Sequence, residues 1–217
     1  MKEKIITADG SFSYYDSTIN ECYHSKNGAY SESTHVYINN GLNYWFEKNK
    51  KKICRIFELG YGTGLNALLA KRYAEKNKLK VVYHTIDKFP LTANQIEVIK
   101  PRKLSTSDNF VYSAAWDSEF SLTSFFSIHK IHADFFIYQF DNTYDIFFYD
   151  AFAFHAQPQI WKKNILKKSI DVLNNNGVWV TYCSKGIVRR AVESFDVKVE
   201  KIPGFSRKRE MLRALKK

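Results

Sequence analysis

The sequence predicts an α/β fold built on a mostly parallel sheet with helices on both faces. From Lys52 onward, apolar runs of strand length alternate with segments that suit helices, which is the pattern of βαβ units. The run Ile53–Leu59 leads directly into a glycine-rich turn. Tyr144–Tyr149 is apolar almost throughout, as expected of a strand that is buried on both faces. In such open sheets, ligands bind at the carboxyl ends of the strands.

Residues 1–45 have a different pattern. Asp9-Gly10 and Asn27-Gly28 are dipeptides typical of hairpin turns, and strand-forming residues lie near both. We therefore expect a β-rich N-terminal appendage over residues 1–45 and the α/β domain over residues 46–217.

Each element of the α/β domain follows from an apolar run bounded by turn residues. Asn175-Asn176-Gly177 suits a helix stop followed by a turn, and Pro203-Gly204 joins the last two strands, of which the final one is expected to run antiparallel. The polar and aromatic connection Ser118–Asn142 is expected to hold a helix around Leu122–His129. The expected strands are Ile53–Leu59, Val81–Asp87, Phe110–Ala114, Tyr144–Tyr149, Val178–Tyr182, Lys198–Ile202 and Glu210–Leu215, and the other expected helices are Leu65–Lys76, Thr92–Ile99, Trp161–Leu173 and Val188–Phe195.

The composition indicates a folded protein with an anionic partner. The 217 residues are 45% hydrophobic, which excludes a disordered chain, and the net charge of +11 favours nucleic acid first and an anionic membrane second. The alternative is a surface charge that only keeps the protein in solution. Residues 201–217 hold seven Lys or Arg against one acid, Glu210, so a net charge of +6 lies there.

The cysteines and the N-terminus bear on the compartment. Cys22, Cys54 and Cys183 lie far apart without a C-x-x-C pair, which argues against a disulfide framework or a thiolate metal site. The first residues lack the apolar core of a signal peptide, and no apolar run approaches the ~20 residues that a membrane helix needs. We expect a cytoplasmic protein without a metal or a membrane partner, and its oligomeric state stays open.

The turn after the first parallel strand is the most specific local signal. Its glycines, Gly60, Gly62 and Gly64, stand two apart, and Glu58 precedes them. Glycines let the backbone approach a ligand closely, and the following helix presents free N–H groups to an anionic group. Leu65 stands where dinucleotide enzymes have their third glycine, which weighs against a nicotinamide oxidoreductase. The pattern resembles motif I of class I S-adenosylmethionine-dependent methyltransferases, with Rossmann-like sheets.

Acidic residues follow four of the expected strands: Glu58, Asp87, Asp117 and Asp150. S-adenosylmethionine offers a ribose diol, an adenine amine, an α-amino group and a sulfonium, all of which carboxylates can accept or balance. Asp87 is expected on the ribose, Asp117 on the adenine amine, and Glu58 with the glycine backbone on the amino-acid end. The alternative for each acid taken alone is a solvated loop residue or a helix cap, and it weighs most for Asp117. The expected cofactor-binding residues are Glu58, Gly60, Gly62, Thr63, Gly64, Asn66, Asp87, Lys88 and Asp117.

Asp150 opens the second cluster, which runs from Tyr149 to Trp161. Methyl transfer is an in-line displacement, so alignment supplies most of the catalysis, and a carboxylate can align an amine and accept its proton. Phe152 could stack on an extruded base, although aromatic residues in such loops are more often core lids. We therefore expect Asp150 to be catalytic and Phe152 to contact the substrate.

Basic residues follow the fifth strand and the last hairpin turn. Lys185, Arg189 and Arg190 leave the sheet at the same edge as the acids, and Lys208 and Arg209 lie on the expected hairpin tip. All five are expected to meet phosphates of a nucleic acid, although exposed basic turns are commonly only solvated.

Together these segments resemble the methyltransferases of tRNA wobble-uridine modification, which convert 5-aminomethyl-2-thiouridine to its 5-methylaminomethyl form. The match covers nearly the whole chain, and its more specific pieces are Asp87-Lys88-Phe89-Pro90-Leu91, Val188-Arg189-Arg190 and Lys208-Arg209-Glu210-Met211. The resemblance implies that Asp150 is the active-site acid, that Glu58, the glycines and Asp87 hold S-adenosylmethionine, and that the partner is the anticodon region of tRNA.

Two departures from that family matter. Phe154 stands where the family commonly has proline, and bifunctional relatives carry a C-terminal flavin-dependent oxidase, whereas this sequence stops at Lys217. We therefore expect methylation only, on a substrate that arrives as the aminomethyl nucleoside. The alternatives are a non-catalytic RNA-binding module with a relic cofactor pocket, and a methyltransferase acting on another amine in a protein or a small molecule.

Overall fold

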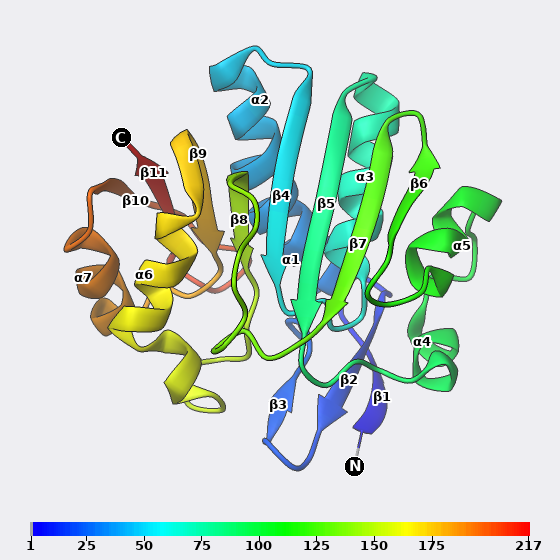
Figure 1. Ribbon diagram of the computed structural model, residues 1–217. Helices are drawn as coiled ribbons and strands as arrows, with labels where there is room; N and C mark the ends of the chain where they lie inside the picture. Colours follow the sequence, from blue (N-terminus) through cyan, green and yellow to red (C-terminus); the bar gives the residue numbers. More distant parts are fainter. Residues whose placement is uncertain (1) are drawn as a thin grey trace.

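The computed structural model describes residues 2–217. Its main feature is an eight-stranded sheet in the order β10-β11-β9-β8-β4-β5-β7-β6, beside a small antiparallel sheet β1-β2-β3 (Figure 1). The large sheet comprises β4 (Ile53–Leu59), β5 (Lys80–Asp87), β6 (Glu119–Thr123), β7 (Phe126–His132), β8 (Tyr144–Tyr149), β9 (Leu173–Thr181), β10 (Val197–Pro203) and β11 (Glu210–Lys216). The small sheet comprises β1 (Lys2–Ile6), β2 (Phe12–Asp16) and β3 (Glu21–Cys22).

The helices are interleaved with the strands of the large sheet. They are α1 (Ala29–Ser33), a π-helical segment (Thr34–Asn43), α2 (Tyr44–Asn49), α3 (Leu65–Asn77), α4 (Ala93–Ile99), α5 (Thr106–Ser113), a 3₁₀ turn (Pro158–Trp161), α6 (Lys163–Asp171) and α7 (Gly186–Glu193).

The predicted α/β class and the mostly parallel sheet are confirmed. β4, β5, β7, β8 and β9 pair in parallel, whereas β11 runs antiparallel to β9 and β10, and β6 runs antiparallel to β7. The chain leaves β4 toward β5 and β7 and later returns to β8 on the other side of β4. This reversal of direction creates a switch point between β4 and β8, where ligands bind in open α/β sheets.

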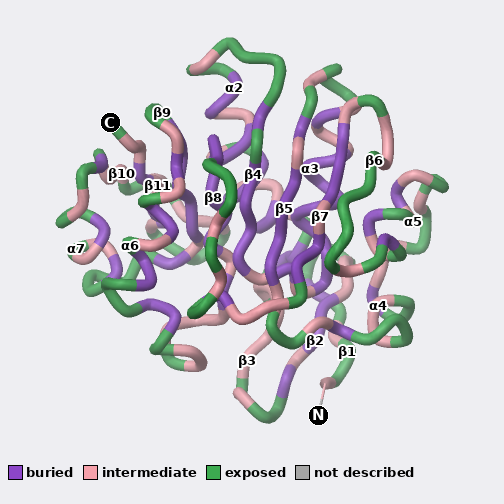
Figure 2. The backbone as a smooth tube through the Cα atoms, in the orientation of Figure 1, coloured by how far each residue is buried: buried purple, intermediate pink, exposed green. Residues whose placement is uncertain are grey.

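Two apolar cores enclose the large sheet, one on each face. In β8, Ile146 and Phe148 face the core under α3 and the helical segment 29–49, while Phe147 and Tyr149 face the core under α6 and α7. Figure 2 shows the resulting buried strands in the middle of the molecule. The apolar run of β8 thus has the two-sided burial that the sequence predicts.

The helical segment 29–49 packs closely on the sheet. A Cβ on Gly41 would lie 2.9 Å from the ring of Phe148 and 3.1 Å from Val180, so only glycine fits here without a shift. π-helical turns often occur at functional sites. This close packing fixes the direction in which the segment projects its side chains.

The prediction of a β-rich appendage over residues 1–45 is met only by residues 2–22. Asp9-Gly10 does form the turn between β1 and β2, but Asn27-Gly28 leads into α1, so its assignment to a hairpin is wrong. The reason is that Asp9 reaches across and caps the helix: Oδ2 accepts hydrogen bonds from the N–H and the hydroxyl of Ser31, both at 2.8 Å. The division of the chain at residue 45 stays a prediction, and it falls inside a helix.

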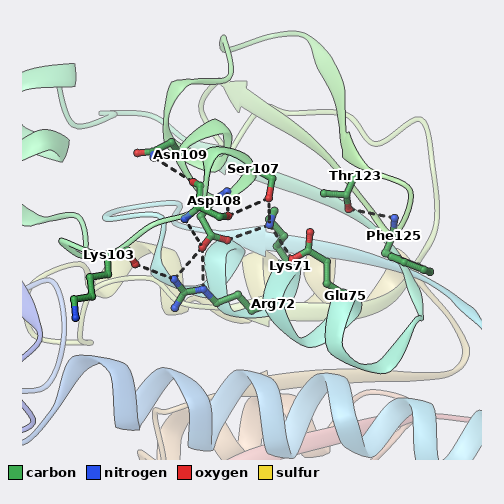
Figure 3. Close-up of polar contacts among 10 residues, drawn as sticks. Lys71, Arg72, Glu75, Lys103, Ser107, Asp108, Asn109, Thr123 and Phe125 are labelled. Atoms are coloured by element: carbon green, nitrogen blue, oxygen red, sulfur yellow. Dashed lines mark hydrogen bonds and ion pairs between the residues drawn. The ribbon is translucent and has the colours of Figure 1, made fainter.

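The third parallel strand was predicted in the wrong place. Phe110–Ala114 belongs to helix α5, which begins with a capping box between Ser105 and Asp108. Figure 3 shows Lys71 and Arg72 of α3 pointing toward Asp108. Lys71 is fully buried, and its ammonium lies 3.0 Å from the carboxylate of Asp108. This ion pair holds α5 against α3 and stabilises the segment as a helix.

The helix expected around Leu122–His129 is also wrong, because the segment forms the hairpin β6–β7. Phe126 and Ile128 alternate along β7 and face the core, and β7 pairs with β5 in parallel. The third parallel strand is therefore β7. The Asn175–Gly177 turn is likewise absorbed into β9, whose pairing with β8 shifts register between Tyr144 and Ile146. The remaining elements agree with the prediction to within a few residues at their ends.

Candidate active site

A cavity of about 860 Å³ opens at the carboxyl ends of β4, β5, β7 and β8. This volume lies in the range of small-molecule sites. Its wall comes from the glycine turn, the ends of these strands and the N-terminal residues that follow β2, and it includes Tyr23, His24, Glu32, Tyr37, Gly60, Gly62, Thr63, Asp87, Lys88, Asp134, Asp150, Phe152, Tyr182 and Lys208.

The glycine turn brings the backbone of β4 against the end of β8. Gly60 has φ +93°, and a Cβ there would lie 2.6 Å from the carbonyl oxygen of Asp150. The N–H of Gly62 donates to Oδ2 of Asp87 at 3.0 Å. Only glycine therefore lets the turn pack this closely against the end of β8, and the backbone of Gly60 and Gly62 lines the cavity.

Asp87 lies at the end of β5 and lines the cavity, as predicted. Its Oδ1 accepts from the N–H of Phe89 at 2.9 Å, which together with Gly62 fixes the carboxylate. Burial raises the pKa of Asp87, and these two hydrogen bonds oppose the rise. Lys88 also lines the cavity, but its ammonium is paired at 2.8 Å with Asp134.

Asp117 does not lie where the sequence analysis placed it. It precedes β6, is exposed, and does not line the cavity; its Oδ1 accepts from the N–H of His132 at 2.8 Å. The acid that follows the third parallel strand and lines the cavity is Asp134, two residues after β7. Sequence reasoning missed Asp134 because it put the third strand at Phe110–Ala114. The signal that could have found it is the alternating run Phe126–Ile131 just ahead of it.

Two buried side chains, Glu58 and Asn66, form a hydrogen-bonded chain with the half-buried Asp150 behind the glycine turn. The amide nitrogen of Asn66 donates to Oε1 of Glu58 at 3.0 Å and to Oδ2 of Asp150 at 2.7 Å, while Thr85 donates to Glu58 at 2.7 Å. Of these residues, only Asp150 lines the cavity. Glu58 and Asn66 therefore stand one layer behind it and hold Asp150 in place. Gly64 likewise lies outside the cavity wall, at the start of α3.

The carboxyl groups of Glu58 and Asp150 both have raised pKa values. Burial, with a smaller contribution from the charge of Asp150, raises the pKa of Glu58 to about 8. Burial also raises the pKa of Asp150 to about 7, although Tyr37 donates to its Oδ1 at 2.6 Å and Asn66 stabilises the charged form. A carboxyl group that titrates near neutrality can both accept and release a proton at physiological pH.

Residues between β2 and α1 cover the glycine turn. The ring of Tyr23 lies beside Gly62 and packs edge-on against Phe152, with 4.9 Å between ring centroids. His24 Nε2 lies 2.6 Å from the hydroxyl of Thr63, and burial lowers the pKa of His24 to about 4, so its imidazole is neutral. Sequence reasoning did not select these two residues as site residues, because they belong to the segment taken as an appendage.

The basic residues predicted to bind nucleic acid divide into two groups. Lys208 lines the cavity and pairs with Glu32 at 2.7 Å. Lys185, Arg189, Arg190 and Arg209 do not line it. Arg189 is paired with Glu193 at 2.7 Å, and the ammonium of Lys185 lies 5.1 Å from the ring centroid of Phe154. Within residues 2–217, no ion pair or hydrogen bond involves the side chain of Arg209 or its neighbour Arg207.

Residues 2–217 contain no group of three or more His, Cys, Asp or Glu side chains arranged to hold a metal ion. None of their helices combines the length and the apolar character that crossing a bilayer requires.

Comparison with known proteins agrees with this geometry. The model of a family described as S-adenosyl-L-methionine-dependent methyltransferase matches residues 113–217. A crystal structure of MnmC2 from Aquifex aeolicus superposes with a TM-score of 0.79 at 24% identity, covering 99% of this chain and 70% of that one. A class I S-adenosylmethionine-dependent methyltransferase structure from Listeria monocytogenes gives a TM-score of 0.50 at 12% identity over 81% of this chain and 58% of that one.

The chain is also similar in sequence to curated proteins. The bifunctional protein MnmC of tRNA 5-methylaminomethyl-2-thiouridine biosynthesis from Leptospira interrogans is 30% identical over 206 residues, and that from Actinobacillus pleuropneumoniae is 26% identical over 216 residues. Each match covers 88% of this chain but only 32% of the relative, so the chain spans about a third of the length of the proteins it matches.

The resemblance that the sequence motifs indicate is thus confirmed by independent comparisons. The structure places a cavity at the switch point of the sheet, next to the glycine turn, which is where open α/β sheets bind their ligands. The chain thus has the fold of these solved methyltransferase structures, and over 88% of its length it is similar in sequence to the MnmC proteins.

Proposed function

We propose that this protein methylates the amine of 5-aminomethyl-2-thiouridine at the wobble position of tRNA, giving the 5-methylaminomethyl nucleoside. The likeness to MnmC proteins supports this substrate. The observation that carries the proposal is Asp150: a half-buried carboxyl group directly after β8 that lines the cavity, accepts hydrogen bonds from Tyr37 and Asn66, and has its pKa raised to about 7.

The residues of the cavity fit S-adenosylmethionine. Asp87 and Asp134 offer carboxylates to a ribose diol and an amine, and the backbone of Gly60 and Gly62 lines the cavity beside them. Bound S-adenosylmethionine supplies an electrophilic methyl group. Glu58, Gly64 and Asn66 then act through the shape of the glycine turn and the position of Asp150, because they lie behind the wall of the cavity.

Asp150 has two tasks in this reaction. A primary amine arrives protonated at neutral pH and must lose a proton before it can attack. The ionised Asp150 takes that proton from the ammonium group, and the lone pair it leaves on nitrogen forms the new N–C bond as the C–S bond breaks. Tyr37 and Asn66 hold both oxygens of Asp150, so the carboxylate is aligned before the substrate enters.

Phe152 and the exposed basic side chains supply the contacts expected for RNA. Phe152 lines the cavity beside Asp150 and offers a ring edge to a base, while Lys185, Arg190 and Arg209 are exposed and can reach phosphates of the anticodon region. The formal charge of +11 supports a polyanionic substrate.

The test uses tRNA from cells that leave the wobble nucleoside at the aminomethyl stage. The protein is incubated with this tRNA and methyl-labelled S-adenosylmethionine, and the digested nucleosides are separated. We expect label in 5-methylaminomethyl-2-thiouridine only, and no label with Asp150→Asn, which keeps the size of the side chain and one of its two hydrogen-bond acceptors. Label in another nucleoside or in no nucleoside, although the tRNA is bound, contradicts the proposal.

A further inference from the structure

Glu32 is a second buried carboxylate at the end of the cavity where Asp150 lies. It belongs to α1, lines the cavity and is only 8% exposed. Its Oε2 accepts from the N–H of Ser25 at 3.0 Å, and its Oε1 lies 2.7 Å from the ammonium of Lys208. A buried carboxylate needs such partners, since an unpaired charge is costly away from water. Here the cationic partner comes from the turn between β10 and β11, 176 residues away.

The ring of Tyr182 forms a second side of the site in which the ammonium of Lys208 lies. The ammonium of Lys208 lies 4.4 Å from the ring centroid of Tyr182, a distance at which a cation is attracted by the ring. The hydroxyl of Tyr182 donates to the carbonyl oxygen of Ala151 at 2.8 Å. Because Ala151 follows Asp150 directly, the ring is fixed to the segment that carries the active-site acid.

The electrostatics place these groups within reach of one another. The charges of Asp150 and Glu32 both raise the pKa of Tyr182 and of Tyr37, after burial as the larger cause. The charge of Glu32 raises the pKa of Asp150, whereas that of Lys208 lowers it. A primary ammonium group, in the form of the lysine side chain, thus already sits between an aromatic face and a carboxylate beside Asp150.

We propose that Glu32 and the ring of Tyr182 form the subsite that receives the protonated amine of the substrate, and that Lys208 fills it until the substrate enters. This inference rests on the proposed function, because it assigns the recognition of the aminomethyl group. Lys208 is suited to leave: its side chain is 43% exposed, so its ammonium can return to water while the ammonium of the substrate takes over the pairing of the buried Glu32. Once displaced, its ammonium is free to meet a phosphate of the RNA.

The subsite explains how an amine is selected before it reacts. The ammonium is held by Glu32 and Tyr182, Asp150 removes one proton, and the neutral amine attacks. A hydroxymethyl or unmodified uridine lacks the positive charge, so it does not displace Lys208 from its ion pair with Glu32. Selection and proton removal are therefore carried by different carboxylates.

The test compares Glu32→Gln with Glu21→Gln. Glu21 is a control because it lines the same cavity but pairs with His155, at 3.2 Å, instead of with Lys208. Binding of two tRNAs, one with 5-aminomethyl-2-thiouridine and one unmodified, is measured on protein saturated with S-adenosylhomocysteine, so that no methyl is transferred. Thermal unfolding of each variant checks that the fold is kept.

We expect wild-type protein and Glu21→Gln to prefer the aminomethyl tRNA, and Glu32→Gln to lose about tenfold or more of that preference, since a charge-assisted hydrogen bond is lost. Lys208→Met should keep the preference, because it removes the competing cation but not the subsite. An unchanged preference in Glu32→Gln, or an equal loss in Lys208→Met, overturns the subsite. Wild-type protein that methylates no aminomethyl tRNA overturns the proposed function itself, whereas methylation with an unchanged preference in Glu32→Gln overturns only the subsite.

Discussion

The phenol of Tyr37 donates a hydrogen bond of 2.6 Å to Oδ1 of Asp150, across 113 residues of sequence. Tyr37 lies in the π-helical segment 34–43, which packs on the sheet, and its ring is 2% exposed. A rigid donor of this kind favours the charged form of the carboxyl group and opposes the effect of burial. The π-helical segment therefore contributes directly to the pKa of Asp150.

Tyr37→Phe should move the acid limb of the pH–rate profile to higher pH. Loss of the hydrogen bond removes roughly 1.5–3 kcal/mol of stabilisation from the charged carboxylate, which corresponds to about one to two pH units. The pKa of Asp150, about 7 in the wild type, rises, so the active ionised form requires a more alkaline solution. Methyl transfer is measured as a function of pH, with Tyr30→Phe, a partly exposed tyrosine of α1, as the control. A profile that falls in height without shifting contradicts the assignment.

Asp134→Asn should weaken cofactor binding more than it slows the chemical step. Asp134 lines the cavity and pairs with Lys88, whereas it makes no contact with Asp150. Loss of its charge leaves Lys88 unpaired and removes an acceptor for the cofactor. We expect the Kd for S-adenosylmethionine, measured by calorimetry, to rise about tenfold, a typical effect of losing a hydrogen bond to a charged group. Asp117→Asn is the control. An equal rise of the Kd in both variants would show that Asp117 contributes to cofactor binding as much as Asp134 does.

Glu58→Gln should make the stability of the protein less dependent on pH. The folded-state pKa of Glu58, about 8, lies above its ordinary value of 4.5, so the folded protein binds more protons than the unfolded chain between these values. Stability therefore falls as pH rises from about 4.5 to about 8, by an amount on the order of a few kcal/mol. Asp150 contributes in the same direction, so part of the fall remains.

Urea unfolding at a series of pH values measures this dependence. Glu97→Gln, at an exposed position of α4, is the control and should leave the slope unchanged. A slope in Glu58→Gln as steep as that of the wild type would show that Glu58 is ionised in the folded protein.

Lys71→Met should destabilise the protein by about 3 kcal/mol, because it leaves the buried carboxylate of Asp108 with one cationic partner instead of two. Lys71 is fully buried and donates to Ser107 and Asp108, while Arg72 keeps a 3.0 Å contact with Asp108 (Figure 3). Urea unfolding is the measurement, and Lys76→Met, exposed on the same helix, is the control. Equal stability of the two variants would show that α5 does not depend on this pair.

Arg207→Glu with Arg209→Glu should flatten the salt dependence of tRNA binding. Each phosphate contact contributes about one to the slope of log K against log salt, so the slope should fall by about two. The control is Lys76→Glu with Lys78→Glu, which changes the net charge equally at the end of α3 that lies away from the cavity. If the control flattens the slope as much, the effect is one of overall charge and the hairpin tip is only solvated.

The sequence alone determined the features that depend on neighbouring residues. A strand followed by a glycine turn places Gly60 against the carboxyl end of the sheet, and an acid at the end of a strand, such as Asp87 or Asp150, reaches the same edge. These are local rules, because the direction of each parallel strand fixes where its last residue lies. They were sufficient for the fold class and for bringing Asp87 and Asp150 to one cavity.

The tertiary structure decided what depends on partners far apart in the sequence. The local sequence of Phe110–Ala114 suits a strand or a helix. The segment forms part of helix α5 because Asp108, at the start of that helix, makes a buried ion pair with Lys71 of α3. The contacts of Tyr37 with Asp150 and of Glu32 with Lys208 join the N-terminal helical segment to distant parts of the chain. No local pattern encodes such pairs, since burial and charge complementarity select them only once the sheet has formed.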